Sequence, residues 1–361
     1  MYETGVVVGK FYPFHLGHQL LVRAALEQAR RVDVMLCEGP GETADGARRA
    51  GWIRRIFSSE LAAGRLVVHE LVNDLPGAPG PWADRTFEVL GGRHPDAVFS
   101  SEDYGHAWAA RMGADHVLVD RARREVPVSG TIVRSDPLSH LVMLDPVVRA
   151  DVVPRVVVLG AESTGTSTLA WDLAAHYRTA SVAEYGREHT EATKVSGAEV
   201  WTREEFELIA RVQAEREDAA AGNADPVLVC DTDPFATGLW FERYFPGERS
   251  EVVEAFARDR ARGAGAPLGP LGTILTSPRG VELEQDGWRE GGRARLAMHD
   301  RFRERLGEEG RSFLEVVGSR DERLQQAVAY CDGLIVQAHK PWAEPEPEIS
   351  LAEWEASLIG A

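Results

Sequence analysis

The sequence VVVGKFYPFHLGH, residues 6–18, decides how the chain begins to fold. Its leading apolar run predicts a buried strand, and the spacing of apolar residues beyond it predicts a helix over 19–30. A helix that begins directly after a strand offers unpaired amides and the positive end of its dipole, which attract phosphate. His15 and His18 flank Gly17 at this helix start, so both imidazoles could donate hydrogen bonds to phosphoryl oxygens, although such histidines can also simply cap a helix.

A second stretch of the same kind, VVVLGAESTGTST, occupies residues 156–168. It joins an apolar strand to a helix predicted over 167–177, and it follows the P-loop pattern G-x-x-x-x-G-K-[ST] except that Thr166 takes the place of the lysine. The amides of such a loop cradle the phosphates of ATP, and the hydroxyl of Ser167 would reach Mg²⁺. The predicted ATP-binding residues are Gly160, Glu162, Ser163, Thr164, Gly165, Thr166, Ser167 and Thr168.

Around these two stretches, short apolar runs alternate with amphipathic segments, a pattern typical of parallel sheets covered by helices. Because the strand–turn–helix cycle restarts after residue 154, we predict two α/β domains with parallel sheets. Further helices are predicted over 48–60 and 324–330. The predicted boundaries are 1–150 for the first domain, 154–340 for the second, and 341–361 for a C-terminal tail.

The composition narrows the classes of partner and compartment. A formal net charge of −17 disfavours non-specific binding to nucleic acid or to an anionic membrane. Lys10, Lys194 and Lys340 are the three lysines, so bound phosphates must be held mainly by amides and arginines. The cysteines are far apart and residues 1–10 run directly into a strand, so we expect a cytoplasmic protein without disulfides or a signal peptide.

Polar side chains follow several other predicted strands. The segment 129–134, SGTIVR, begins another helix, and the guanidinium of Arg134 suits phosphate oxygens. The string Asp231-Thr232-Asp233 ends an apolar strand, where a carboxylate can bind Mg²⁺ or accept a hydroxyl proton. Residues 286–295, DGWREGGRAR, have the composition of a mobile lid and equally of an ordinary charged loop. The arginines that could replace the missing lysine are Arg289, Arg293 and Arg295.

The first 140 residues resemble the HxGH nucleotidyltransferases, and among them the nicotinamide mononucleotide (NMN) adenylyltransferases of NadR type. The resemblance rests on GKFYPFHLGH (9–18), ARRAGWIRRIF (47–57), FSSEDYG (99–105) and SGTIVR (129–134). It implies a Rossmann-like fold in which the phosphate of NMN attacks the α-phosphorus of ATP and releases pyrophosphate. It also implies Mg²⁺ and no covalent enzyme intermediate, so that catalysis consists of positioning and charge stabilisation.

The same resemblance assigns residues to this site. It implies that His15, His18 and Arg134 are catalytic, and that Gly9, Phe11, Gly17, Ser129 and Thr131 bind ATP. For the nicotinamide ring we predict stacking on Trp82 or Tyr104, which as aromatic residues could equally belong to the core or its rim. Arg48 or Arg49 could meet the NMN phosphate, and a solvated helix face explains both residues as well.

Residues 155–340 are similar to the ribosylnicotinamide kinase domain of NadR-type proteins. The shared strings are GAESTGTST, EYGRE (184–188), DTDPF (231–235) and the lid at 286–295, whereas Thr166 departs from the lysine usual in the family. The similarity implies Asp231 or Asp233 as the base near the ribose 5′-hydroxyl, Glu184 and Arg187 at the riboside, and Ser167 with Asp231 at Mg²⁺. Some relatives carry a DNA-binding helix-turn-helix first; this chain starts at the first strand, so we expect no repressor activity.

Together these features predict an enzyme of NAD salvage that phosphorylates nicotinamide riboside and adenylylates the resulting NMN. The expected partners are ATP, NMN and nicotinamide riboside, without nucleic acid or membrane, and the sequence leaves a homo-oligomer open. Two alternatives remain at this point. The P-loop half could bind ATP or NAD as a sensor without turnover, or the first half could act on another phosphorylated acceptor, such as a pantetheine or glycerol derivative.

Overall fold

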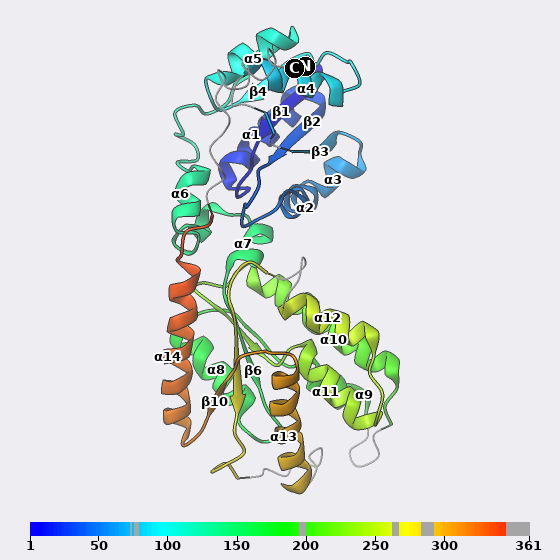
Figure 1. Cartoon of the computed structure of the whole chain (residues 1–361), viewed down its shortest axis with the longest axis vertical. Helices are drawn as coiled ribbons and strands as arrows, with labels where there is room; N and C mark the ends of the chain where they lie inside the picture. Colours follow the sequence, from blue (N-terminus) through cyan, green and yellow to red (C-terminus); the bar gives the residue numbers. More distant parts are fainter. Residues whose placement is uncertain (73, 76–78, 195–199, 262–266, 283–291, 344–361) are drawn as a thin grey trace, which may run out of the picture. The chain divides into compact units, whose positions relative to one another are not determined.

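The computed structural model describes residues 1–72, 74–75, 79–194, 200–261, 267–282 and 292–343, apart from the side chains of Pro79 and Tyr104. The chain divides into two compact units (Figure 1). The first contains Met1–Val148 and the segment from Pro341, and the second contains Arg149–Lys340. The chain therefore leaves the first unit once and returns to it after the second. Over the described residues, no helix combines the length and the apolar character needed to cross a membrane.

The first unit is built on a five-stranded parallel sheet with the order β3-β2-β1-β4-β5. The central strand is buried, and Val6 in it lies opposite Asp33 of β2 and Val98 of β4. Strand order reverses between β1 and β4, which places a crevice at the carboxyl ends of these strands. The strands are β1 (Tyr2–Gly9), β2 (Ala29–Glu38), β3 (Leu66–Val72), β4 (Ala97–Ser100) and β5 (Asp115–Leu118).

The helices of the first unit correct two predicted boundaries. The helix predicted over 19–30 ends earlier because Ala29 already has extended backbone and begins β2. The helix predicted over 48–60 is two helices, since the backbone leaves the helical region at the buried Phe57 (φ −108°, ψ 32°). The helices are α1 (Leu16–Gln28), α2 (Gly46–Ile56), α3 (Ser58–Ala62), α4 (Pro79–Val89), α5 (Tyr104–Met112), α6 (Gly130–Ser135) and α7 (Pro146–Val152), with a 3₁₀ segment over Leu138–Met143.

The second unit also contains a five-stranded parallel sheet, in the order β10-β9-β6-β8-β7. Its central strands β6 and β8 are wholly buried, as their unbroken apolar runs predict. The strands are β6 (Arg155–Leu159), β7 (Ser181–Val182), β8 (Leu228–Asp231), β9 (Leu271–Thr276) and β10 (Leu314–Val316).

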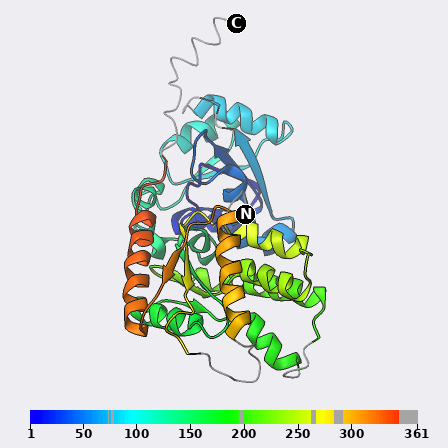
Figure 2. The same cartoon turned by 60° about the horizontal axis from the view of Figure 1, so that its bottom comes forward.

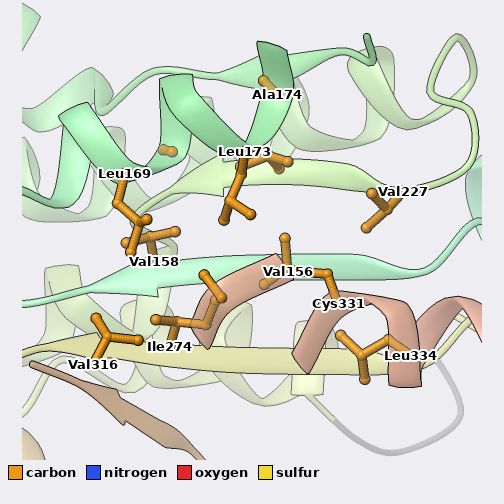
Figure 3. Packing of buried hydrophobic residues seen from close by; sticks show 13 residues of the cluster. Val156, Val158, Leu169, Leu173, Ala174, Val227, Ile274, Val316, Cys331 and Leu334 are labelled. Atoms are coloured by element: carbon orange, nitrogen blue, oxygen red, sulfur yellow. The ribbon is translucent and has the colours of Figure 1, made fainter. Parts of the chain in front are cut away.

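Helices cover both faces of this second sheet. Figure 3 shows one core cluster in which Leu169 of α8 lies beside Val158 of β6, and Cys331 of α14 lies beside Val156 of the same strand. Figure 2 shows α13 (orange) and α14 (red) running along opposite sides of β10. The helix predicted over 324–330 is much longer in the structure, because Ser319 begins it with a capping box. The helices are α8 (Thr166–Tyr177), α9 (Tyr185–Thr193), α10 (Arg203–Ala221), α11 (Pro234–Tyr244), α12 (Glu251–Ala261), α13 (Gly292–Glu308) and α14 (Arg320–Ala338).

Candidate active sites

The first unit contains a cavity of about 280 Å³ at the carboxyl ends of its strands. The turn after β1, the segments after β4 and β5, and the start of α6 line it. These segments meet where the strand order reverses, which is where open α/β sheets bind ligands. Of the predicted residues, Gly9, Phe11, His15, Gly17, His18, Ser129, Thr131 and Arg134 line this cavity.

His15 and His18 lie at the start of α1 with their rings stacked, 3.6 Å apart between centroids. Nδ1 of His15 accepts a hydrogen bond from the backbone N–H of His18 (3.3 Å), and the backbone N–H of His15 donates to Nδ1 of His18 (3.4 Å). The two imidazoles thus form a capping box with each other's backbone. Because both Nδ1 atoms are acceptors, a neutral ring carries its proton on Nε2.

The histidine pair is held neutral by its surroundings. Burial, together with the guanidinium groups of Arg123 and Arg134, lowers the pKa of His15 to about 4. Burial also lowers the pKa of His18 well below its usual value, followed by the effect of His15. Each neutral ring therefore carries its proton on Nε2, and the ring of His18 also has a hydrogen bond to the backbone of Pro13. Capping and phosphate binding, the two roles that the sequence left open, do not compete, because they use different ring nitrogens.

The start of α6 lies against the turn that follows β1. Ser129 caps the helix by accepting a hydrogen bond from the N–H of Ile132 (3.3 Å). A Cβ at Gly130 would lie 2.7 Å from the carbonyl oxygen of Tyr12, so this approach requires glycine. Arg134 donates to the same carbonyl oxygen (2.7 Å) and to Oγ1 of Thr131 (3.3 Å). The structure thus brings together two segments that lie about 110 residues apart in the sequence.

Four charged residues of this cavity were missed by the sequence reasoning. Lys10 and Arg123 add two cations to its lining, and Arg123 also pairs with Glu102 (2.9 Å). The carboxylate of Asp120 accepts hydrogen bonds from the backbone N–H groups of residues 124–126, which shapes the loop after β5. The signal was available, because loops that follow parallel strands at a switch point line the site.

The residues predicted for NMN are not among those that line the cavity. Trp82 belongs to α4, where it packs against the core of the first unit. Tyr104 begins α5, and its side chain lies outside the described part of the chain. Arg49 is fully buried and ion-paired with Glu42, and it donates to the carbonyl oxygens of Lys10 and Cys37. The solvated helix face considered for Arg49 is therefore wrong.

The second unit contains a cavity of about 240 Å³ around the turn between β6 and α8. Gly165 and Ser163 both have left-handed backbone, with φ of +86° and +53°. The hydroxyls of Thr166 and Ser167 hydrogen-bond to the carboxylate of Asp231 at the end of β8. Burial raises the pKa of Asp231, although these hydrogen bonds and Arg187 oppose the rise. The two residues predicted at Mg²⁺, Ser167 and Asp231, are thus direct neighbours.

Carboxylates dominate the charge of this second cavity. The described residues that line it include Glu162, Glu184, Asp231 and Glu282, and Arg187 is their one cation. Burial raises the pKa of Glu184 to about 7, with Asp231 and Glu162 adding to the rise and Arg187 opposing it. Such crowding of acids is typical of a functional site, because a stable fold alone gains nothing from it.

An adjoining cavity of about 200 Å³ shares Glu162, Glu184, Arg187, Thr232 and Trp240 with the cavity at the turn between β6 and α8. It has an aromatic wall, of which Trp240 also lines the other cavity, and the sequence reasoning missed this wall because its rings come from α10, α11 and the segment before α10. A wall of rings beside carboxylates suits a planar cationic group. The rings are those of Trp201, Phe206, Trp240 and Tyr244.

Two residues predicted for the second site, Thr164 and Asp233, do not line either cavity of the second unit. Thr164 is buried, and its hydroxyl donates to the carbonyl of Ala161 (2.7 Å) and contacts that of Thr276 (2.7 Å). Asp233 caps α11 and pairs with Arg311 (2.9 Å), outside both cavities. Of the two carboxylates that the sequence left open as the base, Asp231 lines the cavity and Asp233 does not.

The arginines predicted to replace the P-loop lysine at position 166 are not among the described residues that line the cavity. Arg289 falls outside the described residues, and Arg293 is exposed in the first turn of α13. Arg295 is buried and donates to the carbonyls of Ser163 (2.9 Å) and Val281 (3.0 Å). Arg323 of α14, not considered before, donates to the carbonyl of Thr164 (3.0 Å). Arg295 and Arg323 thus bind main-chain carbonyls of the loop and do not line the cavity.

Comparison with known proteins agrees with this architecture. A family model described as an AAA domain, AAA_28, matches residues 155–323. The chain is 29% identical over 273 residues to the trifunctional NAD biosynthesis/regulator protein NadR of Escherichia coli K12, and 28% identical over 275 residues to that of Salmonella typhimurium LT2. Each match covers 70% of this chain, and the chain spans 65% of the length of each relative.

Solved structures share the fold of the whole chain. A NadR protein in complex with NR superposes with a TM-score of 0.70 at 21% identity, covering 92% of this chain and 96% of that one. A NadR protein in complex with NAD and AMP-PNP gives a TM-score of 0.66 at 20% identity, covering 91% and 96%. The chain is thus a homologue of the NadR proteins and has the two-unit fold seen in their structures.

Proposed function

We propose that the first unit transfers AMP from ATP to NMN, giving NAD and pyrophosphate. The observation that carries this proposal is the stacked pair His15–His18 at the start of α1, which lines the same cavity as Arg134. The Nδ1 atom of each ring accepts a hydrogen bond from a backbone amide. The phosphate oxygen of NMN forms a bond to the α-phosphorus of ATP, and the bond to the β-phosphate oxygen breaks. The negative charge that develops on the departing pyrophosphate needs donors fixed in advance.

The residues of the cavity can supply that stabilisation. The Nε2–H groups of His15 and His18, the amides at the start of α1, and Arg134 are all donors without a carboxylate in the same turn. Lys10 and Arg123 add positive charge to the lining. Because the enzyme makes no covalent bond in this scheme, its contribution is orientation and electrostatics.

The test is direct. Purified protein with ATP, Mg²⁺ and NMN should form NAD and pyrophosphate in equal amounts. His18→Ala should abolish both products. If wild-type protein consumes ATP with a phosphopantetheine or glycerol phosphate acceptor and not with NMN, the acceptor named here is wrong while the reaction class stands.

We further propose that the second unit phosphorylates nicotinamide riboside with ATP. The P-loop turn faces the β8 carboxylate Asp231, and the adjoining cavity with its aromatic wall and carboxylates suits a cationic pyridinium riboside. In this proposal Asp231, which lines the cavity of the P-loop turn, accepts the proton of the 5′-hydroxyl as the γ-phosphoryl group is transferred to that oxygen and ADP leaves. The sensor alternative keeps one observation in its favour, because Thr166 and four carboxylates surround the place of the missing lysine.

Mg²⁺ fits the residues that are present. Ser167 and Asp231 supply a hydroxyl and a carboxylate in direct contact, the oxygen donors that Mg²⁺ takes. One carboxylate and one hydroxyl are enough protein ligands for this ion, because Mg²⁺ usually keeps several waters and takes further oxygens from substrate phosphates. When bound, the ion would neutralise phosphate charge among the carboxylates.

The kinase is tested separately. Nicotinamide riboside and ATP with Mg²⁺ should give NMN and ADP, and Asp231→Asn should stop this reaction while NAD formation from NMN continues. Tight ATP binding with unchanged riboside would instead support the sensor. We also propose a reducing, cytoplasmic environment, because the three cysteines are buried thiols that lie far apart in the sequence.

A further inference from the structure

A short segment beyond the second unit returns to the first active site. Pro341–Ala343 follow α14 and belong to the first unit (Figure 1, red). The backbone N–H of Trp342 donates to the carbonyl oxygen of Arg134 (3.0 Å). The indole of Trp342 packs on the ring of Tyr12, with 5.6 Å between centroids. A segment more than 300 residues away in the sequence therefore contacts the turn that bears the two histidines.

Tyr12 is fixed from every side. It is 1% exposed, and its hydroxyl donates to the carbonyl of Ala343 (2.8 Å) and accepts the N–H of Thr43 (2.8 Å). The N–H of Ala343 in turn donates to Oγ1 of Thr43 (2.9 Å). The returning segment thus closes a ring of hydrogen bonds around the tyrosine hydroxyl.

Arg134 depends on the same tyrosine. Its Nη1 donates to the carbonyl oxygen of Tyr12 (2.7 Å), and its guanidinium carbon lies 5.0 Å from the centre of the Tyr12 ring. A guanidinium on an aromatic face gains a cation–π attraction, and this attraction requires the ring to keep its orientation. Trp342 packs on Tyr12 and its backbone binds Arg134, so it contacts both members of this pair.

We propose that Trp342 is a positioning residue for adenylyl transfer, which holds Tyr12 and through it keeps the guanidinium of Arg134 directed at the triphosphate. The inference rests on the proposed function of the first unit and adds a residue to it. Trp342 itself does not line the cavity. Its effect is therefore on the orientation of a donor, and a misplaced donor costs rate even though no contact to the substrate is lost.

The test compares three variants of the full chain in NAD formation. Trp342→Ala should lower kcat/KM for ATP about tenfold, with KM for NMN changed less than about twofold, because Arg134 serves the triphosphate and not the acceptor ring. Trp342→Phe keeps a ring against Tyr12 and should recover most of the loss. Trp171→Ala is the matched control, since Trp171 is 69% exposed in the second unit.

Several outcomes separate a positioning role from simple support of the fold. Wild-type kcat/KM for ATP in Trp342→Ala overturns the inference and leaves the proposed function intact. An equal loss in Trp342→Ala and Trp342→Phe, matched by a fall in melting temperature, overturns it as well. If wild-type protein forms no NAD while it phosphorylates nicotinamide riboside, the function of the first unit is wrong and the inference falls with it.

Discussion

The two phosphate loops of this chain, residues 9–18 and 160–168, share a strand–turn–helix plan and differ in the charge around them. The cavity of the first loop is lined by Lys10, Arg123 and Arg134, by the carboxylates of Glu102 and Asp120, and by two neutral imidazoles. Among the described residues, four carboxylates and Arg187 line the cavity of the second loop. The two loops thus have a similar backbone plan, but the charges that line their cavities differ. The first can attract a triphosphate by itself, whereas the second needs a counter-ion to do so.

The arginines near the two loops also serve different purposes. In the first unit, Arg134 reaches the cavity and is oriented by the turn. In the second unit, Arg295 and Arg323 bind outward-facing carbonyls of the loop and do not line its cavity. Their charge fixes the backbone, so that the amides keep facing the phosphates. In the proposed reactions, the first loop would hold phosphate with side chains as well as amides, whereas the second would rely mainly on its main chain.

The largest expected effect comes from a substitution that changes the first loop and leaves the second intact. His18→Ala removes one fixed donor and opens the capping box, and we expect NAD formation to fall by about 100-fold or more. NMN formation from the riboside should not change, because the second loop is intact. The control is His106→Ala, which changes an exposed histidine of the same unit. A loss of both reactions would mean that the two loops are not independent.

The second prediction tests the main-chain role of the arginines. Arg323 donates to the carbonyls of Gly318 (2.8 Å), Thr164 (3.0 Å), Ser277 (2.9 Å) and Arg279 (3.0 Å). Arg323→Ala leaves the buried carbonyls of Thr164 and Ser277 without this donor and should lower the free energy of unfolding of the second unit by about 3 kcal/mol in a urea titration.

The matched control for this change is one turn away on α14. Arg320 forms an exposed ion pair with Asp172, and its side chain is 68% exposed. Arg320→Ala should therefore have little effect on stability. Equal losses in the two variants would show that the four carbonyl contacts contribute nothing beyond a surface charge.

The sequence predicted the sheets and the loops better than the residues around them. Unbroken apolar runs located most of the strands, because a parallel strand that is covered by helices on both faces is apolar along most of its length. The choice between Asp231 and Asp233 could not be made, since it depends on where β8 ends and which residue caps α11. The packing of Trp342 on Tyr12 depends on a tertiary contact between distant segments, for which no local pattern exists.

The third prediction concerns pH in the acidic cavity. Because the pKa of Glu184 is raised to about 7, the folded state binds a proton that the unfolded state has lost. The stability of the second unit should therefore fall as pH rises from 4.5 to 7. Glu184→Gln removes this fall, and above pH 7 the variant should be more stable than wild type by roughly 2 kcal/mol.

The control for the pH effect lies on the same helix. Glu188 is exposed and paired with Arg216 (2.7 Å), which lowers its pKa. Glu188→Gln should therefore lose a little stability above pH 4.5, the opposite sign. Urea titrations at pH 5 and pH 8 measure both variants. A Glu184→Gln variant with the pH dependence of wild type would show that this carboxyl titrates normally.

The last prediction tests whether a lysine at position 166 would strengthen ATP binding, or whether the site requires a neutral side chain there. Thr166→Lys places an ammonium among Glu162, Glu184 and Asp231. If phosphate binding is limited by charge, KM for ATP in riboside phosphorylation should fall about tenfold, because a hydrogen bond to a charged group is worth that much. Thr166→Val removes the hydroxyl bond to Asp231 without adding charge, and it separates the two changes. A Thr166→Lys protein slower than Thr166→Val would mean that the ammonium pairs with Asp231 and blocks it, so the carboxylate cluster requires the neutral side chain.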